Sequence, residues 1–153
     1  MSFKEKVHFV IREIQTSDLK SGFFDTLSNL AHVGIISNES RRAQKILSEI
    51  KSFPFYTIFV AVEEEDGQII GSITILIEQK FIHNGGKVGH IEDVVTRKGY
   101  QGMGIGKALV LEAIHFAKQN KCYKVILDCS KNNVEFYKKI GFKEHEVSMR
   151  IDL

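Results

Sequence analysis

The chain has 153 residues, 43% of them hydrophobic and 26% charged, and a formal net charge of +2. This size and composition favour one globular domain over residues 1–153 and exclude a disordered or fibrous chain. So small a charge gives no reason to expect binding to nucleic acid or to an anionic membrane. No stretch approaches the roughly 20 apolar residues of a membrane span, and the first ten residues carry no secretory signal, so we expect a cytoplasmic protein.

Hydrophobic periodicity and turn residues predict an alternation of strands and helices along the chain. The expected elements are a strand at 8–14, helices at 18–33 and 39–51, strands at 56–62, 69–79 and 88–95, a helix at 104–119, a strand at 123–129, a helix at 132–140 and a last strand at 146–151. This order predicts an α/β (α+β) fold whose central sheet is mixed, mostly antiparallel and flanked by helices on both faces.

The two cysteines, Cys122 and Cys129, lie seven residues apart without the spacing of a metal site, so no metal is expected. One of them as a nucleophile remains an alternative. We prefer two reduced core cysteines in an intracellular protein.

The most informative stretch is GYQGMGIGK at residues 99–107, where three alternate glycines follow a strand and open a helix. Backbone N–H groups without intrahelical partners, at the positive end of a helix dipole, favour a pyrophosphate. A P-loop is excluded because Ala108 follows Lys107 where Ser or Thr is needed. The dinucleotide fingerprint fails because Lys107 replaces its third glycine. The pattern Gln-x-x-Gly-x-Gly fits, and a glycine-rich turn without a ligand stays open as an alternative.

That pattern resembles the pyrophosphate loop of the GCN5-related N-acetyltransferases (GNAT). Four further stretches are similar to the glucosamine-6-phosphate N-acetyltransferase branch: KFIH at 80–83, GHIEDVV at 89–95, CYKVILDC at 122–129 and NVEFYKKIGF at 133–142. The resemblance covers nearly the whole chain. It implies transfer of acetyl from acetyl-CoA to the amine of D-glucosamine 6-phosphate, by direct attack in a ternary complex, for UDP-N-acetylglucosamine synthesis. No permanently bound cofactor is implied, because acetyl-CoA is a co-substrate.

The resemblance also assigns roles to individual residues. The implied catalytic residues are Glu92, Asp93 and Tyr137. Acetyl-CoA binding is implied for Val94, Val95, Gln101, Gly102, Met103, Gly104, Ile105, Gly106, Lys107, Asn133 and Tyr137. Substrate binding is implied for Lys80, His83, Glu92, Asp93, Asp128 and Arg150, with Asp128 reaching the sugar from the neighbouring subunit.

Neighbouring strand residues point to opposite faces, so Glu92 and Asp93 can serve one site only if their strand bulges or splays. We favour Glu92 as the base. The phenol of Tyr137 stays protonated at neutral pH and can donate to a departing thiolate. In the alternative reading, one carboxylate only faces solvent, Tyr137 belongs to the core and Asn133 caps a helix.

Two departures from the branch bear on phosphate recognition. Asp152 and Leu153 stand where basic residues are typical, and Ala31 replaces a polar residue that can contact substrate. An acetyltransferase of the same fold for another amine (a polyamine, aminoglycoside or peptide) therefore remains the alternative, followed by a non-catalytic acyl-CoA sensor. The resemblance further implies a homodimer with active sites at the subunit interface, with residues 146–151 as a strand exchanged between chains.

Overall fold

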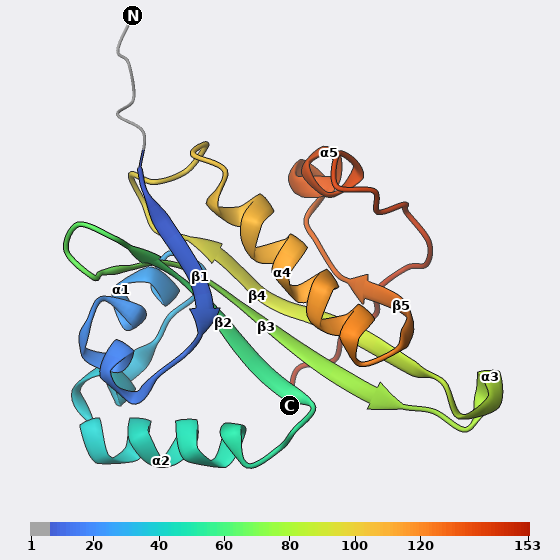
Figure 1. Ribbon diagram of the computed structural model, residues 1–153, viewed down its shortest axis with the longest axis horizontal. Coiled ribbons are helices and arrows are strands. Elements are labelled where there is room, and N and C mark those ends of the chain that lie inside the picture. Colours follow the sequence, from blue (N-terminus) through green and yellow to red (C-terminus); the bar gives the residue numbers. More distant parts are fainter. Residues whose placement is uncertain (1–6) are drawn as a thin grey trace, which may run out of the picture.

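The computed structural model describes residues 7–153, which contain a five-stranded sheet in the order β1-β2-β3-β4-β5 (Figure 1). Residues 1–6 lie outside this range. The prediction that the first ten residues carry no secretory signal therefore concerns residues that are mostly outside the described part of the chain. The strands are β1 (Phe9–Glu13), β2 (Tyr56–Glu63), β3 (Ile69–Gln79), β4 (Lys87–Thr96) and β5 (Cys122–Leu127). The α-helices are α1 (Phe23–Leu27), α2 (Ser40–Lys51), α3 (Ile82–Gly85), α4 (Ile105–Gln119) and α5 (Val134–Lys138). Short 3₁₀ helices lie at Thr16–Lys20, Gly34–Asn38 and Lys131–Asn133.

The sheet is mixed. Strands β1 to β4 pair antiparallel with their neighbours, and β5 pairs parallel to β4. The parallel pair needs a crossover, which α4 provides by returning the chain along the sheet. The predicted fold class, a mostly antiparallel mixed sheet with helices on both faces, is confirmed.

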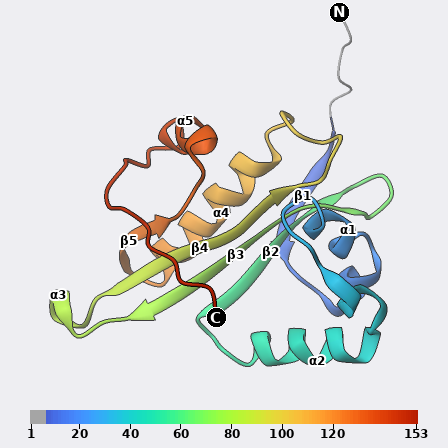
Figure 2. The ribbon, with the colours of Figure 1, turned by 180° about the vertical axis from the view of Figure 1, so that it is seen from behind.

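Different helices cover the two faces of the sheet (Figures 1 and 2). Along β2, Phe59 and Ala61 belong to the apolar cluster under α4, whereas Ile58, Val60 and Val62 belong to the cluster under α1 and α2. Both faces of β2 are therefore buried. This explains why its sequence is a continuous apolar run instead of an alternation of apolar and polar residues.

The single helix predicted over 18–33 is wrong. The chain forms a 3₁₀ helix at Thr16–Lys20 and then the short α1, separated by Gly22 in the left-handed region with φ +86°. Asp18 does not begin a long helix, because its side chain is buried against Arg12, with an N–O distance of 2.7 Å. A long-range ion pair and a left-handed glycine therefore break the helical pattern.

The predicted last strand at 146–151 is also wrong for the described chain. The segment is unpaired, and its alternate apolar side chains are exposed: Val147 by 86%, Met149 by 90% and Ile151 by 84%. A strand needs a neighbouring strand to satisfy its backbone, and none of residues 7–153 pairs with this segment.

The expectation of two core cysteines fails for one of them. Strand β5 is the edge of the sheet, and each of its residues is either half-buried or exposed. Cys122 is half-buried and Cys129, two residues after the strand, is exposed; both thiols are free.

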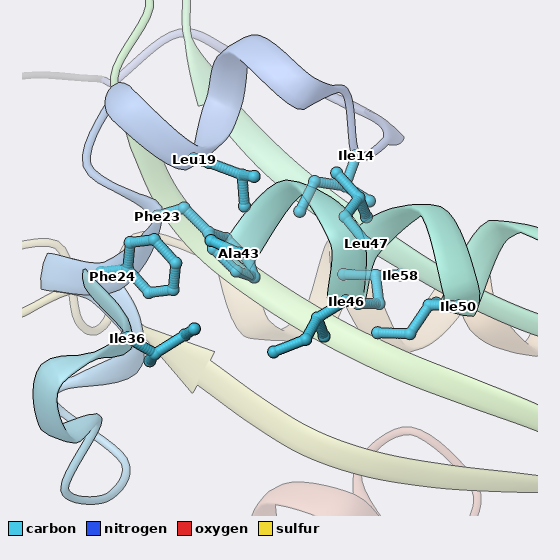
Figure 3. A pocket seen from close by; sticks show the side chains of 10 residues that line it. All are labelled: Ile14, Leu19, Phe23, Phe24, Ile36, Ala43, Ile46, Leu47, Ile50 and Ile58. Atoms are coloured by element: carbon cyan, nitrogen blue, oxygen red, sulfur yellow. The ribbon is translucent and has the colours of Figure 1, made fainter. Parts of the chain in front are cut away.

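A small apolar cavity of about 60 Å³ lies between α2, α1 and the first strands (Figure 3). Phe24, Ile36 and Ala43 are among its lining side chains, all of which are apolar. A cavity with no polar group offers nothing to orient a substrate. It is a packing gap beneath α2, and the candidate site lies elsewhere.

Candidate active site

A bulge in β4 carries the two adjacent carboxylates. Thr74 of β3 pairs with Glu92, but Ser72 pairs with Val95, so Asp93 and Val94 together oppose the single residue Ile73. Asp93 has a φ of +51°, in the left-handed region. An extra residue bends the strand and re-aims its side chains. The splay that the sequence requires for a two-carboxylate site is therefore present.

Glu92 and Asp93 are both exposed. Glu92 points away from α4, since its neighbour Ile91 is buried in the α4 cluster. The charges of both Asp93 and Glu92 act on Tyr56, which packs on the same face, opposite α4. Asp128 follows β5, and the pairing of Ile91 with Leu127 brings it next to Glu92 within the same chain. Although the side chain is exposed, partial desolvation of its carboxyl group, followed by the charges of Asp93 and Asp128, raises the pKa of Glu92. The three carboxylates form an acidic group, and the prediction that Asp128 acts across a subunit boundary stays a prediction.

Strands β4 and β5 diverge just beyond this group. Their pairing ends at Ile91 and Leu127, whereas β4 continues to Thr96 paired only with β3. Beyond Ile91 and Leu127 the two strands are separated. This separation connects the sheet face covered by α4 with the opposite face, which carries the carboxylates. Backbone groups near Val94, at the bulge, lie at this opening.

The glycine turn has the geometry predicted for anion binding. Gly102 and Gly104 have φ of +78° and +85°, and α4 begins at Ile105. The first intrahelical bond runs from Ala108 N–H to Gly104 O at 3.0 Å, so the N–H groups of residues 105–107 precede it. These amides point along the helix axis away from α4, as an anion site requires.

The turn is held by contacts from distant segments. The backbone N–H of Lys98 donates to Oδ1 of Asn29, after α1, at 2.7 Å. The hydroxyl of Tyr100 donates to Oε2 of Glu63, at the end of β2, at 2.8 Å. The turn at 101–107 is therefore fixed to both α1 and β2, which fixes its amides in position before any ligand arrives.

Tyr137 lies on the α4 side of the sheet and is only 8% exposed. Its ring packs edge-on against Phe136 and Phe142, with centroid distances of 4.9 and 5.9 Å. Burial, followed by the charge of Cys129, raises the pKa of Tyr137. The phenol is thus both partial core and a protonated donor. Asn133 is the N-cap residue of α5, but its side chain makes no capping hydrogen bond.

The predicted phosphate-binding residues Lys80 and His83 lie at the far end of the β3–β4 hairpin from the carboxylates. Lys80 lies six residues beyond Thr74, the partner of Glu92, which is about 20 Å along the hairpin. Its Nζ pairs with Glu78 Oε1 at 2.7 Å. His83, in the left-handed turn of α3, stacks on Tyr123 with ring centroids 4.3 Å apart.

Arg150 lies in the exposed C-terminal segment, and its Nε donates to Oδ1 of Asp152 at 2.7 Å. Asp152, which stands where a basic residue is typical, therefore forms an ion pair with the guanidinium of Arg150. Ala31 is exposed just after α1 and offers no polar group.

Sequence reasoning missed Tyr56 at the start of β2. The charges of Asp93 and Glu92, after burial, raise the pKa of this tyrosine, so its phenol is close to the acidic group. Only the pairing of β2 with β3 and of β3 with β4 brings it there, and no local motif signals it.

The comparisons with known proteins agree with this geometry. The pattern of the Acetyltransferase (GNAT) family matches residues 24–142, and the chain belongs to this family. It is 37% identical to the glucosamine 6-phosphate N-acetyltransferase of Arabidopsis thaliana, over 92% of this chain and 94% of the relative. It is 36% identical to the enzyme of that name from Candida albicans, over 92% and 93% of the two chains. The crystal structure of the Arabidopsis thaliana enzyme superposes with a TM-score of 0.88, covering 95% of this chain and 98% of the other.

Within residues 7–153, no helix has the length and apolar character needed to cross a membrane. The same residues contain no group of three His, Cys, Asp or Glu side chains placed to hold a metal ion.

Proposed function

We propose that this chain transfers the acetyl group of acetyl-CoA to the amine of D-glucosamine 6-phosphate. The observation that carries the proposal is the acidic bulge of β4, placed beside the divergence of β4 and β5 and followed by the glycine turn. The family, and relatives of that activity that align with nearly the whole chain, support it.

In this proposal the glycine turn binds the donor. The N–H groups of residues 105–107 would hold the pyrophosphate of acetyl-CoA, with the dipole of α4 behind them. Gln101, Met103 and Lys107 border the same turn, and Asn133 would contact the pantetheine arm. Acetyl-CoA is a co-substrate that arrives and leaves in each turnover.

The chemistry would take place at the bulge. The sugar amine attacks the thioester carbon, forming a C–N bond, and the C–S bond breaks. Glu92 takes the amine proton, directly or through water, and its raised pKa makes it a stronger base near neutral pH. Backbone N–H groups near Val94 and Val95 would stabilise the negative charge on the carbonyl oxygen. Tyr137 would give a proton to the sulfur that leaves.

We propose that phosphate recognition uses a second copy of the chain. Lys80 lies about 20 Å along the hairpin from the acidic group of its own chain, and Arg150 lies in the exposed C-terminal segment. We infer a homodimer in which they, and His83, reach the site of the partner. A groove of about 870 Å³ beside the edge strand β5 supports this inference, together with the exposed alternate apolar residues of the C-terminal segment. The segment 146–151 of one copy would pair along the other.

The first experiment measures thiol release from acetyl-CoA with glucosamine 6-phosphate, beside glucosamine, glucose 6-phosphate, spermidine and a peptide amine. We expect turnover that needs both the amine and the phosphate. Turnover with spermidine or the peptide alone would keep the donor site and reject the substrate. Tight CoA binding with no turnover would favour an acyl-CoA sensor.

The second experiment mixes two inactive variants, Glu92→Gln and Arg150→Ala, after subunit exchange. If Arg150 serves the partner's site, a mixed dimer has one intact site, so activity should return to about a quarter of wild type. No recovery, with mixed dimers present by mass spectrometry, would place Arg150 outside the partner's site. Sedimentation of the wild type gives the oligomeric state independently.

The proposal also treats residues 1–153 as a single N-acetyltransferase domain. We expect it in the cytoplasm, since both proposed substrates carry phosphate groups that hinder unaided passage through a membrane. Its product would supply UDP-N-acetylglucosamine synthesis.

A further inference from the structure

Tyr56 stands across the sheet from the acidic bulge. It pairs with Leu76 on β3, and Leu76 pairs with His90 on β4, so the three residues share one face. Glu92 lies on that face two residues further along β4. With strands about 4.8 Å apart and about 3.3 Å per residue, the Cα atoms of Tyr56 and Glu92 are about 12 Å apart. Two side chains that rise from one face over this distance leave room for a sugar ring between their tips.

The surroundings of Tyr56 fix its ring and leave its hydroxyl available. The ring packs against the apolar cluster under α2, which includes Ile58, and Ile50 packs against the same cluster. No other group among residues 7–153 hydrogen-bonds its hydroxyl. Burial, and then the charges of Asp93 and Glu92, raise the pKa of Tyr56, so the phenol keeps its proton. It is therefore a neutral donor facing a group of acceptors.

A phenol that faces carboxylates suits an acceptor substrate with hydroxyl groups better than an aliphatic amine without them. Ionised carboxylates only accept hydrogen bonds, whereas a sugar hydroxyl both donates and accepts. A hydroxyl held between Glu92 or Asp93 and a phenol can donate to the carboxylate and accept from the phenol. An aliphatic amine without hydroxyls gains nothing from the phenol, and a site built to bond a hydroxyl discriminates against substrates that lack it.

We propose that Tyr56 is a specificity-determining residue of the acceptor site, whose hydroxyl donates a hydrogen bond to an oxygen of the hydroxylated amine held by Glu92 and Asp93. The inference rests on the proposed function for the identity of the sugar. It adds β2 to the elements that build the site, beside the bulge of β4 and the end of β5.

The test compares Tyr56→Phe with the wild type and with Ser37→Ala, which removes an exposed hydroxyl of the 3₁₀ helix at Gly34–Asn38, outside the acidic group. Losing one neutral hydrogen bond should raise the KM for glucosamine 6-phosphate about threefold to tenfold. The KM for acetyl-CoA should not change, and Ser37→Ala should resemble the wild type. The ratio of kcat/KM for the sugar to that for spermidine should fall by the same factor in Tyr56→Phe.

An unchanged KM for the sugar in Tyr56→Phe would overturn the inference, as would an equal rise in the KM for acetyl-CoA. A thermal melt identifies a general folding defect, and Tyr56→Phe is expected to melt with the wild type because it keeps the ring. Calorimetric binding of the sugar phosphate to the CoA-bound protein gives the same comparison without turnover. Failure of the wild type to use or bind this sugar would reject the proposed function, and the same variants with whichever amine is turned over then decide the role of Tyr56.

Discussion

Gly71 of β3 allows the first turn of α4 to pack directly on the sheet, and Gly71→Ala tests that contact. A Cβ at this position would lie 2.7 Å from Cγ2 of Ile105 and 2.9 Å from Cδ1 of Leu109. These two side chains are 1% and 0% exposed, so neither has free space to move into. Because Ile105 is the first residue of α4, the helix must shift where its amides face the glycine turn.

The expected cost follows from this geometry. Overpacking a filled core costs about 1–3 kcal/mol, and replacing a strand glycine returns about 0.5–1 kcal/mol. The net loss of unfolding free energy should be about 1–2 kcal/mol, which lowers Tm by about 3–6 °C for a chain of this size. Displacement of even one amide from the pyrophosphate should raise the KM for acetyl-CoA about tenfold, since a hydrogen bond to a charged group contributes about 1.5 kcal/mol.

Gly89→Ala is the matched control. Gly89 lies on β4, faces α4 as Gly71 does, and its added Cβ would meet Ala117, Ile75 and Val125 at 3.3–3.4 Å. These contacts are milder and lie at the opposite end of the helix, so we expect a Tm within about 2 °C of wild type and an unchanged KM. Equal effects of the two variants on KM, measured by thiol release at one protein concentration, would refute the reasoning.

Three further variants test the phenol of Tyr137, the charge of Asp128 and the buried ion pair between Asp18 and Arg12. Tyr137→Phe should lower kcat about 10–100-fold and leave the amine KM unchanged, and a wild-type kcat would exclude Tyr137 as proton donor. Asp128→Asn removes a charge that raises the pKa of Glu92, so the acidic limb of the kcat/KM profile should move to lower pH; an unmoved limb argues against Glu92 as the base. Asp18→Asn should cost about 2–3 kcal/mol in urea unfolding at pH 7, since Asp18 is buried but Arg12 is 31% exposed. Burial raises the pKa of Asp18, but hydrogen bonds and the charge of Arg12 outweigh burial and lower the pKa overall. The stabilisation is therefore complete above the pKa of Asp18 in the unfolded chain. It should vanish as the pH falls through the lower pKa of Asp18 in the folded chain.

The elements predicted best from the sequence are those whose local pattern and packing agree. Strand β3 has the predicted bounds, Ile69–Gln79, because turn residues flank a run that is buried over most of its length. Helix α4 begins after Gly104, whose positive φ a residue with a side chain rarely adopts. At these places the residue type alone indicates the backbone conformation.

The errors occur where a distant contact decides the structure. The helical pattern over 18–33 is real, but the ion pair between Arg12 and Asp18 and the left-handed Gly22 interrupt it. The segment 146–151 alternates like a strand, yet a strand forms only with a neighbour, and the described chain provides none. Both decisions depend on groups that lie outside the segment in question.

The candidate site divides in the same way. The glycine turn can be predicted because its chemistry is local, residue by residue. The two carboxylates of β4 are adjacent in sequence, but only the register shift opposite Ile73 brings both to one face. Tyr56 lies 36 residues before Glu92, and only two successive strand pairings bring it within reach.

The acidic group is itself an argument that this region is kept for function. A carboxylate whose folded pKa is raised binds its proton more tightly in the folded state, so its ionised form opposes folding at neutral pH. Glu92 is in that position, because partial burial and the charges of Asp93 and Asp128 raise its pKa. The left-handed backbone of Asp93 further lowers the stability of the folded state. A cationic ligand between these carboxylates relieves the repulsion, and a sugar amine that arrives protonated is such a ligand. In the proposed function, the same charge that weakens the empty fold would attract the acceptor and prepare Glu92 to take its proton.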